Sequence, residues 1–412
     1  MLASDAGSEL RTSSMPMLPD IKSYDVLIVG MGPAGATAAY ELSRAGYAVL
    51  GLEKERHPRY KVCGGGLSVR IDQILEEDFK SVVEDTIYGV QFTYRGEEPY
   101  VIHSSRPIAY MVMRDRFDHL LVEKARKAGA DVREGEQALA FHPRADGVDV
   151  VTDRGRYRTK VLIGADGANS LVAQRLFPAR RWRRLPSLES EIGLGRKPVY
   201  PGEGRVLIDL GATKSGYAWV FPKREQLSIG IAEFRDRVCS PKRLFDRFVG
   251  DDKELARMQV PRPSGHPLPL FSPGARFAPH TLVSHRALLV GDAGHLVDPL
   301  FGEGIYYAVR SGQMAAASVR GLFDDRRRSL MDYEQAVMHE IYAEFRIASR
   351  LARIVYTFPR LCHRLMHRYQ EVIGLYYDVL RGKETYQTFF QKAKGLVKAS
   401  FRELLLEANP LR

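Results

Sequence analysis

The segment GMGPAG, residues 30–35, constrains the fold of this chain more than any other feature. An apolar run over residues 24–30 precedes it, and small residues with helical propensity follow it as far as Gly46. A second apolar run occupies residues 48–53. A buried strand, a helix and another buried strand within roughly 30 residues predict a βαβ unit of a parallel sheet.

At each of its three glycine positions, this segment requires glycine for a different reason. Gly30 permits a tight turn, Gly32 lets the backbone approach a pyrophosphate at the helix N-terminus, and Gly35 allows the helix to lie close to the sheet. Glu53 ends the second strand 23 residues after Gly30, where a carboxylate can accept hydrogen bonds from ribose hydroxyls. These features predict a dinucleotide site. The residues assigned to it here are Gly30, Gly32, Pro33, Ala34, Gly35, Glu53 and Lys54.

Three later segments favour FAD as the dinucleotide. GADGANS, residues 164–170, follows a buried strand and resembles an element of flavin-dependent hydroxylases and reductases. GDAGH, residues 291–295, supplies a carboxylate suited to ribityl or phosphate-proximal groups. PLFGEGI, residues 299–305, offers backbone N–H groups at a helix start, which suit the electron-rich edge of a reduced flavin. The cofactor residues predicted in these segments are Asp166, Gly167, Asp292, Gly302, Gly304 and Ile305.

Three stretches resemble the geranylgeranyl reductase family of FAD-dependent proteins. They are PRYKVCGGGLS (residues 58–68), YAWVFPK (217–223) and GDAGHLVDPLFGEGIYYAVRSG (291–312), and YAWVFPK is the most diagnostic. The sequence departs from the pattern at His295, where the reductases often have glycine. It also has Ala173 where many hydroxylases have arginine. The resemblance implies reduction of isolated carbon–carbon double bonds in a polyprenyl substrate by a proton and a flavin hydride.

The resemblance also suggests residues near the flavin. Cys63 precedes three glycines that can bring the backbone against the flavin ring, so Cys63 is a candidate catalytic residue. It can equally be a small apolar filler. The predicted cofactor set is completed by Cys63, Gly64, Gly65, Gly66, Arg114 and Ala138.

The aromatic residues of YAWVFPK alternate along a predicted strand. Tyr217, Trp219 and Phe221 therefore share one face, where they form either a wall for a polyprenyl chain or an ordinary sheet core. Pro222 and Lys223 follow at the strand end and are included in the predicted substrate site. Lys223 either pairs with an anionic head group or is solvated.

These patterns predict an α/β fold with a Rossmann-like FAD-binding domain of glutathione-reductase type. We expect that domain to be discontinuous, over residues 23–82, 111–180 and 273–330. Antiparallel sheet over residues 83–110 and 181–272 would form the substrate domain. Residues 1–22 are expected to be a flexible tail and residues 331–412 a C-terminal helical region.

The formal net charge of +11 is concentrated near the C-terminus, where residues 346–412 contain thirteen Lys or Arg and five Asp or Glu. This region has the pattern of a basic amphipathic helix at a membrane surface, and also of a helix that covers a domain. A second basic group, Arg175, Arg180, Arg181, Arg183 and Arg184 around Trp182, is interpreted as a solvated surface or a rim for anionic lipid rather than a nucleic-acid site.

Composition excludes several other classes of protein. Three cysteines without metal-ligand spacing predict neither a disulfide scaffold nor a metal site. The first 17 residues lack the apolar core of a signal peptide, and no apolar run is long enough to span a bilayer. We therefore expect a cytoplasmic protein, with peripheral membrane contact through the basic C-terminal region.

Two alternative functions stay open at this point. One is an FAD-dependent monooxygenase of an aromatic or lipid substrate, and the other is a flavin-bearing lipid-binding protein without turnover. The sequence has no second G-x-G-x-x-G segment for a separate nicotinamide domain. The reductant is therefore either NAD(P)H that binds transiently or an electron-carrier protein such as ferredoxin.

Overall fold

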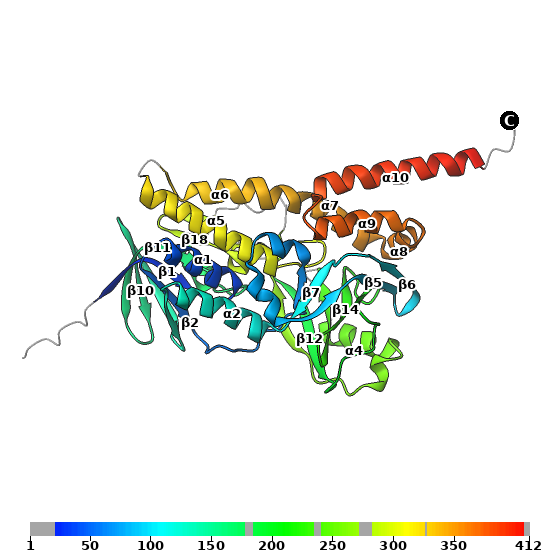
Figure 1. Cartoon of the computed structure of the whole chain (residues 1–412), viewed down its shortest axis with the longest axis horizontal. Coiled ribbons are helices and arrows are strands. Elements are labelled where there is room, and N and C mark those ends of the chain that lie inside the picture. The colour runs from blue at the N-terminus through cyan, green and yellow to red at the C-terminus, as the bar shows by residue number, and fades with distance from the viewer. Residues whose placement is uncertain (1–20, 178–183, 235–239, 272–281, 326–327, 408–412) are drawn as a thin grey trace, which may run out of the picture.

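The computed structural model describes residues 21–177, 184–234, 240–271, 282–325 and 328–407, with side chains as far as residue 396. Residues 1–20 of the predicted tail, Cys239, and Arg180, Arg181, Trp182 and Arg183 of the second basic group lie outside the described residues. Figure 1 shows two structural halves, a parallel sheet with its helices at one end and an antiparallel sheet with the C-terminal helices at the other.

A mainly parallel sheet carries the predicted βαβ unit. Its strand order is β17-β18-β11-β1-β2-β8, with β10 paired to β11 and β9 paired to β10. The strands are β1 (Lys22–Val29), β2 (Val49–Glu53), β8 (Asp131–Glu134), β9 (Ala138–Arg144), β10 (Gly147–Thr152), β11 (Arg156–Gly164), β17 (Val283–Ser284) and β18 (Ala287–Leu289). The β1, β2, β8, β11 and β18 strands run parallel, so their carboxyl ends meet at one edge of the sheet. That edge is where such sheets bind ligands.

Helices pack against the faces of this sheet. α1 lies against both α2 and α5, so the helix that follows the GMGPAG segment is enclosed by two others. The bounds are α1 (Pro33–Arg44), α2 (Arg114–Lys127), α3 (Leu171–Leu176), η4 (Gly291–Gly294) and α5 (Ile305–Asp324).

The second large sheet is almost wholly antiparallel, in the order β16-β12-β15-β14-β13-β5-β6; only β13 and β5 run parallel. Its strands are β5 (Gly89–Tyr94), β6 (Glu97–His103), β12 (Leu185–Gly193), β13 (Arg205–Asp209), β14 (Gly216–Pro222), β15 (Gln226–Glu233) and β16 (Ser264–Leu268). A small three-stranded sheet consists of β3 (Gly66–Ser68), β7 (Ala109–Val112) and β4 (Val83–Ile87). Two short helical turns, η1 (Val69–Gln73) and η2 (Glu77–Val82), lie between β3 and β4.

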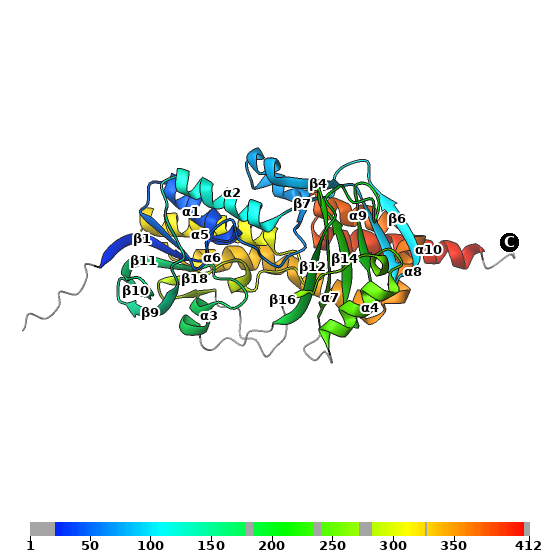
Figure 2. The ribbon, with the colours of Figure 1, turned by 90° about the horizontal axis from the view of Figure 1, so that it is seen from below.

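The two faces of the antiparallel sheet are covered by different helices, as Figure 2 shows. Ala218 and Val220 of β14 pack toward α4 (Pro241–Asp251), whereas Tyr217 and Trp219 pack toward the C-terminal helices. Alternate residues of a strand point to opposite faces, so the predicted common face of the aromatic residues is confirmed. The remaining helices are η3 (Leu255–Arg257), α6 (Met331–Val337), a π-helical segment η5 (Met338–Tyr342), α7 (Ala343–Thr357), α8 (Pro359–Arg368), α9 (Gln370–Leu380) and α10 (Tyr386–Glu407).

The predicted α/β class, with a parallel sheet, an antiparallel sheet and a helical C-terminal region, is confirmed. β1 begins at Lys22, inside the predicted tail, because its first residues extend the pairing with β11. α2 begins at Arg114 and ends at Lys127, before the left-handed Gly129. The domain boundaries stay predictions.

Close packing between α1 and α5 generates a prediction about Gly312. A Cβ atom at this position of α5 would lie 2.4 Å from the backbone oxygen of Ala34, so Gly312→Ala should force the helices apart and destabilise the protein by about 1–3 kcal/mol. Gly250 of α4 is the matched control, since a Cβ there meets no atom within 4 Å. Gly250→Ala should be neutral or stabilising by up to about 1 kcal/mol. Urea unfolding of both variants checks the difference, and equal free energies of unfolding would contradict it.

Candidate active site

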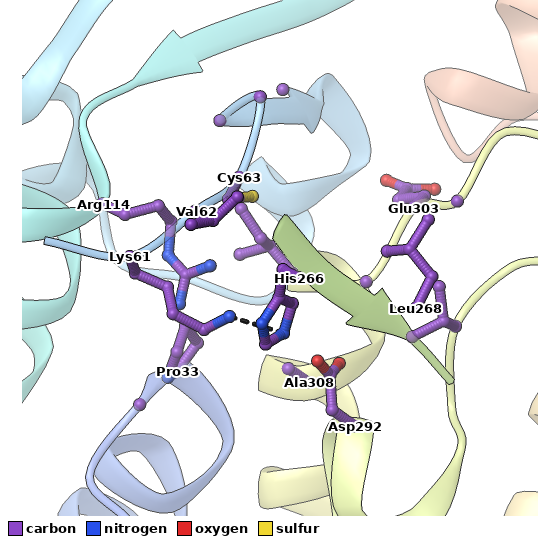
Figure 3. Close-up of a pocket in the computed structure, with 18 of the residues that line it drawn as sticks. Pro33, Lys61, Val62, Cys63, Arg114, His266, Leu268, Asp292, Glu303 and Ala308 are labelled. Carbon is purple, nitrogen blue, oxygen red and sulfur yellow. Dashed lines mark hydrogen bonds between the residues drawn. The ribbon is translucent and has the colours of Figure 1, made fainter. Parts of the chain in front are cut away.

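A cavity of about 650 Å³ lies where the parallel and antiparallel sheets meet. Its walls come from the start of α1, the loop between β2 and β3, strand β14, the start of α5, and α9. Figure 3 shows side chains around the cavity from the start of α1 (Pro33), the loop between β2 and β3 (Lys61 and Cys63), and the segment that leads into α5 (Glu303). The predicted cofactor residues that line it are Gly30, Gly32, Pro33, Ala34, Glu53, Lys54, Cys63, Gly64, Gly65, Gly66, Arg114, Ala138, Asp166, Gly167, Asp292, Gly302, Gly304 and Ile305. Gly35 does not line the cavity.

The structure explains the need for glycine differently at each of the three glycine positions of GMGPAG. Gly30 has a φ of +94°, and a Cβ on Gly35 would lie 1.9 Å from the backbone oxygen of Gly30. Both positions are therefore required by the packing of the protein itself. A Cβ on Gly32 would meet only Nη2 of Arg59, at 3.6 Å. The protein has room for a side chain at Gly32, so a group bound in the cavity is the better explanation for glycine there.

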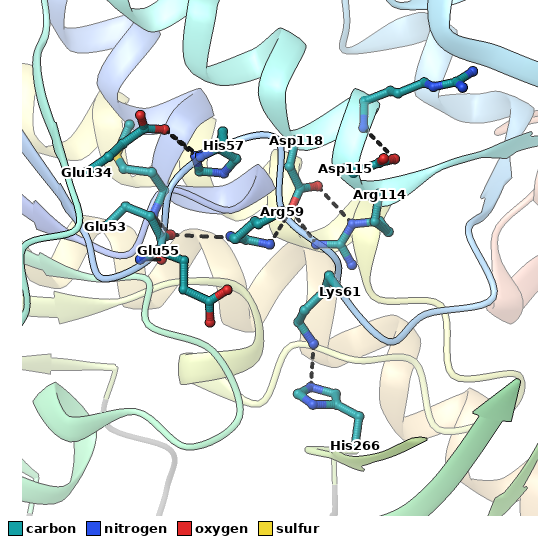
Figure 4. Close-up of polar contacts among 12 residues, drawn as sticks. Glu53, Glu55, His57, Arg59, Lys61, Arg114, Asp115, Asp118, Glu134 and His266 are labelled. Carbon is teal, nitrogen blue, oxygen red and sulfur yellow. Dashed lines mark hydrogen bonds and ion pairs between the residues drawn. The ribbon is translucent and has the colours of Figure 1, made fainter. Parts of the chain in front are cut away.

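Glu53 is held in position by backbone and side-chain groups. The N–H of Met31 donates to its Oε2 at 3.0 Å, and the N–H of Glu55 donates to its Oε1 at 3.2 Å. Nη2 of Arg59 lies 3.6 Å from the same Oε2, and Nη1 of Arg59 lies 3.3 Å from Asp118 (Figure 4). A carboxylate can accept about four hydrogen bonds, so Glu53 keeps capacity for hydroxyls of a ligand.

Asp166 holds the turn of the GADGANS segment. Its carboxylate accepts hydrogen bonds from the Ser170 hydroxyl at 2.5 Å and from the N–H groups of Leu171 at 2.6 Å and Val172 at 3.2 Å, at the start of α3. Burial raises the pKa of Asp166 although these donors lower it. The conformation of this segment, which includes Gly167 at a φ of +76°, follows from these contacts.

Two cations and a buried carboxylate face one another in the cavity. Nζ of Lys61 donates to Nε2 of His266 on β16 at 2.7 Å, a contact between the two halves of the molecule (Figure 4). Burial, together with Lys61 and Arg114, lowers the pKa of His266 to about 3, so this imidazole is neutral. Burial and the nearby Arg114 lower the pKa of Lys61 to about 8. Burial raises the pKa of Asp292, and both cations oppose that rise.

Arg114, a predicted cofactor residue, is the first residue of α2, and only 10% of its side chain is exposed. Its guanidinium donates twice to the carboxylate of Asp118, at 2.8 Å each. Burial lowers the pKa of Arg114, but Asp118 and Cys63 raise it more strongly. The guanidinium therefore stays charged beside the cavity.

The loop that contains Cys63 packs directly against the aromatic strand β14. A Cβ on Gly64 would lie 3.0 Å from the Phe221 ring and 3.2 Å from Nε1 of Trp219. Gly65 has a φ of +73°, and a Cβ there would lie 2.1 Å from the backbone oxygen of Val112. Gly64 thus allows two of the stretches that resemble the reductase family, PRYKVCGGGLS and YAWVFPK, to touch. Cys63 is half-buried, is not in a disulfide, and lines the cavity at this contact.

A buried polar chain lies behind Trp219. Nε1 of Trp219 donates to the Ser228 hydroxyl at 3.3 Å, and that hydroxyl donates to Oε1 of Glu189 at 2.5 Å. Glu189 lies on β12, is 1% exposed and lines the cavity. Burial raises the pKa of Glu189, although Lys223 lowers it. This carboxyl group is therefore protonated to a higher pH than an exposed glutamate.

Of the predicted substrate residues, Tyr217, Trp219 and Phe221 line the cavity, whereas Pro222 and Lys223 do not. The expectation that Lys223 is solvated or faces an anionic head group differs from its position in the structure. It is 1% exposed, and its Nζ lies 3.4 Å from Oε1 of Glu191. A buried lysine needs a carboxylate partner to offset the loss of hydration, so Lys223 is paired with Glu191 inside the sheet and does not reach the cavity.

The segment that follows GDAGH is fixed by buried contacts. His295 adopts a left-handed φ of +58° at the end of η4, which fits a capping position. Asp298 accepts hydrogen bonds from the N–H groups of Leu300 at 2.7 Å and Phe301 at 3.0 Å, and burial raises its pKa to about 6. The Tyr217 hydroxyl donates to the backbone oxygen of Phe301 at 2.5 Å. Strand β14 and the start of α5 are thereby held together.

The cavity residues that the sequence interpretation missed include the polar or aromatic side chains of Arg59, Lys61, Glu189, His266 and Tyr376. Arg59 and Lys61 stand within PRYKVCGGGLS and could have been assigned from that stretch. Glu189 lies on β12 together with the polar residues Ser187, Ser190 and Glu191, so the sequence pattern does not single it out. His266 and Tyr376 carry no local signal, because their place in the cavity depends on long-range packing.

Comparisons with known proteins agree with this geometry. Residues 23–181 match the family model described as an FAD binding domain. The chain is 30% identical to a geranylgeranyl diphosphate reductase of Rhodobacter capsulatus, over 92% of this chain and 96% of that protein. It therefore belongs to the geranylgeranyl reductase family.

Two further relatives extend this picture of the family. A digeranylgeranylglycerophospholipid reductase of Thermoplasma acidophilum is 31% identical, with 72% of this chain and 78% of that protein covered. The solved structure of a geranylgeranyl bacteriochlorophyll reductase-like protein from the same organism superposes with a TM-score of 0.71. It is 25% identical, and the match covers 82% of this chain and 88% of that chain.

FAD fits the residues that this member of the geranylgeranyl reductase family presents. Gly32 leaves room at the start of α1, Glu53 presents a fixed carboxylate, and Lys61 and Arg114 supply positive charge for an anionic group. The individual contacts to FAD stay predictions.

Substitution of Gly32 tests where the cofactor binds. Gly32→Val should leave the fold intact, because the protein has space there, but should abolish FAD binding, because the side chain fills the position of the pyrophosphate. Absorbance of the purified protein and far-UV circular dichroism measure the two effects. A folded variant that stays fully yellow would refute the placement.

Proposed function

We propose that this protein is an FAD-dependent reductase of isolated carbon–carbon double bonds in a polyprenyl, geranylgeranyl-type substrate. The observation that carries the proposal is the aromatic wall of β14, which continues from the FAD side of the cavity into an apolar slot. FAD, when bound and reduced, would supply a hydride to an acceptor carbon. The chain must then provide a proton, a way to exclude water, and a place for a long apolar substrate.

The slot suits a prenyl chain in shape and chemistry. It lies between one face of the antiparallel sheet and helix α9, whose position is fixed by a hydrogen bond of 2.8 Å from the Tyr377 hydroxyl to the backbone oxygen of Ile102. Apolar side chains bury prenyl surface and leave no site for ordered water. The apolar and aromatic side chains that line the slot are Val90, Phe92, Met111, Val206, Ile208, Tyr217, Trp219, Phe221, Leu268, Phe301, Tyr376 and Leu380.

An isolated double bond has no carbonyl group that could be polarised, so protonation must assist hydride addition. Protonation of the less substituted carbon gives a tertiary cation, which captures the hydride at the other carbon. Two side chains beside the aromatic wall can hold a proton, at Sγ of Cys63 and at a carboxyl oxygen of Glu189. We assign the proton to Glu189, because its buried carboxyl keeps a proton to a raised pH.

The relatives differ in the group attached to the prenyl chain. One is named a diphosphate reductase and another a glycerophospholipid reductase, so the prenyl chain is the part that their substrates share. We therefore take the chain as the substrate class. The reductant is either NAD(P)H that binds transiently at the cavity or a reduced carrier protein. Anaerobic reduction of the holoenzyme by NADPH, compared with reduced ferredoxin, distinguishes these donors.

An anaerobic assay tests the proposal. Geranylgeranyl diphosphate or a geranylgeranylated glycerophospholipid, added to the dithionite-reduced holoenzyme, should reoxidise the flavin and gain two hydrogens for each bond reduced. Trp219→Ala should retain FAD but lose turnover of these substrates, because it removes much of the slot wall, whereas Trp219→Phe should keep part of the activity.

Flavin absorbance and mass analysis of the lipid give both readouts. Reoxidation only after oxygen is admitted, with a hydroxylated product, would favour the monooxygenase instead. A bound lipid that is never altered under either condition would favour the non-catalytic protein.

Substitution of Glu189 tests the source of the proton. Glu189→Gln should slow single-turnover reduction of substrate by at least roughly a hundredfold, the usual range for loss of a general acid. In the unaltered enzyme the rate should fall as pH rises through the raised pKa of Glu189, because the carboxyl then loses its proton. That fall should disappear in the variant. Cys63→Ala is the matched comparison, and the same losses there with normal rates in Glu189→Gln would reassign the proton to Cys63.

A further inference from the structure

Four large apolar side chains are exposed at the end of α7, at the junction that follows it and on α8. Ile354, Phe358, Leu361 and Leu365 are 49%, 57%, 56% and 37% exposed. Ile354 lies in the last turn of α7, Phe358 is the non-helical residue between the two helices, and Leu361 and Leu365 lie four residues apart on α8 and so share one face of that helix. We call these four residues the apolar stripe. Such a group of exposed apolar residues indicates an interaction site rather than ordinary surface.

Arginines flank the apolar stripe. Residues 345–370 contain six arginines and no aspartate or glutamate. All six are exposed: Arg346, Arg350, Arg353, Arg360, Arg364 and Arg368. Glu98 of β6, which lies outside the segment, is 3.4 Å from Arg360 and 3.2 Å from Arg364. The face keeps a positive excess, which suits an anionic partner.

The opposite side of the same helices belongs to the core of the antiparallel half. Ala348, Ala352 and Tyr356 of α7 pack with the sheet face that carries Tyr217 and Trp219. α8 leads directly into α9, which lines the cavity with Tyr376, Tyr377 and Leu380. Figure 1 shows α8 and α9 together beside β5 and β6. The apolar stripe is thus one helix away from the slot.

We propose that the apolar stripe and its arginines bind the surface of an anionic phospholipid membrane. Ile354, Phe358, Leu361 and Leu365 enter the boundary between head groups and acyl chains, and the arginines contact lipid phosphates. In the described part of the chain, no helix has the length and apolar character that crossing a bilayer requires, so contact is made at the surface. A bilayer matches both the apolar and the cationic character of the face. The membrane contact is inferred from the exposed side chains themselves. It rests on the proposed function only for its purpose, which is access to a prenyl-lipid substrate in the bilayer.

Vesicle cosedimentation of the FAD-loaded full chain tests the inference without any turnover. The protein should sediment with vesicles of equal parts phosphatidylcholine and phosphatidylglycerol, and much less with phosphatidylcholine alone. Raised salt should release it, because the attraction is electrostatic in part. Arg350→Gln and Arg353→Gln together should weaken the partition coefficient by roughly twenty-five-fold, at about fivefold for each arginine.

Phe358→Ser with Leu361→Ser should also abolish sedimentation. Both side chains are more than half exposed, so the variant should fold and keep FAD. Leu139→Ser with Val199→Ser is the matched control, because these apolar side chains are exposed elsewhere and are 46% and 82% exposed. Binding lost equally in the control, binding unchanged in both C-terminal variants, or equal binding to neutral vesicles would overturn the proposal. So would sedimentation equilibrium showing a dimer that requires Phe358 and Leu361, since a second copy would then cover the face.

If the anaerobic assay fails while vesicle binding behaves as expected, the proposed reaction is wrong and the membrane face stands. If prenyl reduction proceeds without vesicle binding, the reaction stands and the face has another role. The two failures are therefore distinguishable.

Discussion

The contact between the glycine loop and the aromatic strand is the constraint on which the site depends. Gly64 lies against Trp219 and Phe221, and a Cβ there would come within 3.0 Å of the Phe221 ring, so a larger side chain would force the neighbouring rings to shift. This contact joins the loop that follows β2 to the antiparallel sheet. It also sets the width of the cavity, because the loop and the strand are two of its walls. The Lys61–His266 pair makes a second connection between the same halves.

Electrostatics divides the cavity into two environments. Near α1 and α2, Arg59, Lys61 and Arg114 surround the fixed carboxylates Glu53 and Asp118. Near β14 the walls are aromatic and aliphatic, and the nearby carboxyl of Glu189 has a raised pKa. Charge therefore gathers where a phosphate-bearing cofactor is expected, and uncharged surface where a prenyl chain is proposed. The charged side chains and the apolar side chains line different parts of the same cavity.

Features encoded by neighbouring residues could be predicted from the sequence. The βαβ unit follows from the glycines and apolar runs of residues 24–53, and the common face of Tyr217, Trp219 and Phe221 follows from their alternation. The Arg114–Asp118 pair is separated by four residues on a helix and could have been expected from that spacing. The contacts of Lys223 and His266 could not be predicted in this way. Their partners, Glu191 and Lys61, lie 32 and 205 residues away, so only the assembled sheets bring each pair together.

Alternate residues of β14 have different roles: one set lines the slot and the other packs in the core of the sheet. Tyr217, Trp219 and Phe221 face the slot, whereas Ala218 and Val220 pack against α4. Substitutions at the odd-numbered positions can therefore change which lipids fit while the core beneath α4 stays as it is. Substitutions at the even-numbered positions act on the stability of the sheet first. Selection can thus adjust substrate range and stability almost independently within five consecutive residues, and sequence variation among relatives should follow that two-residue period.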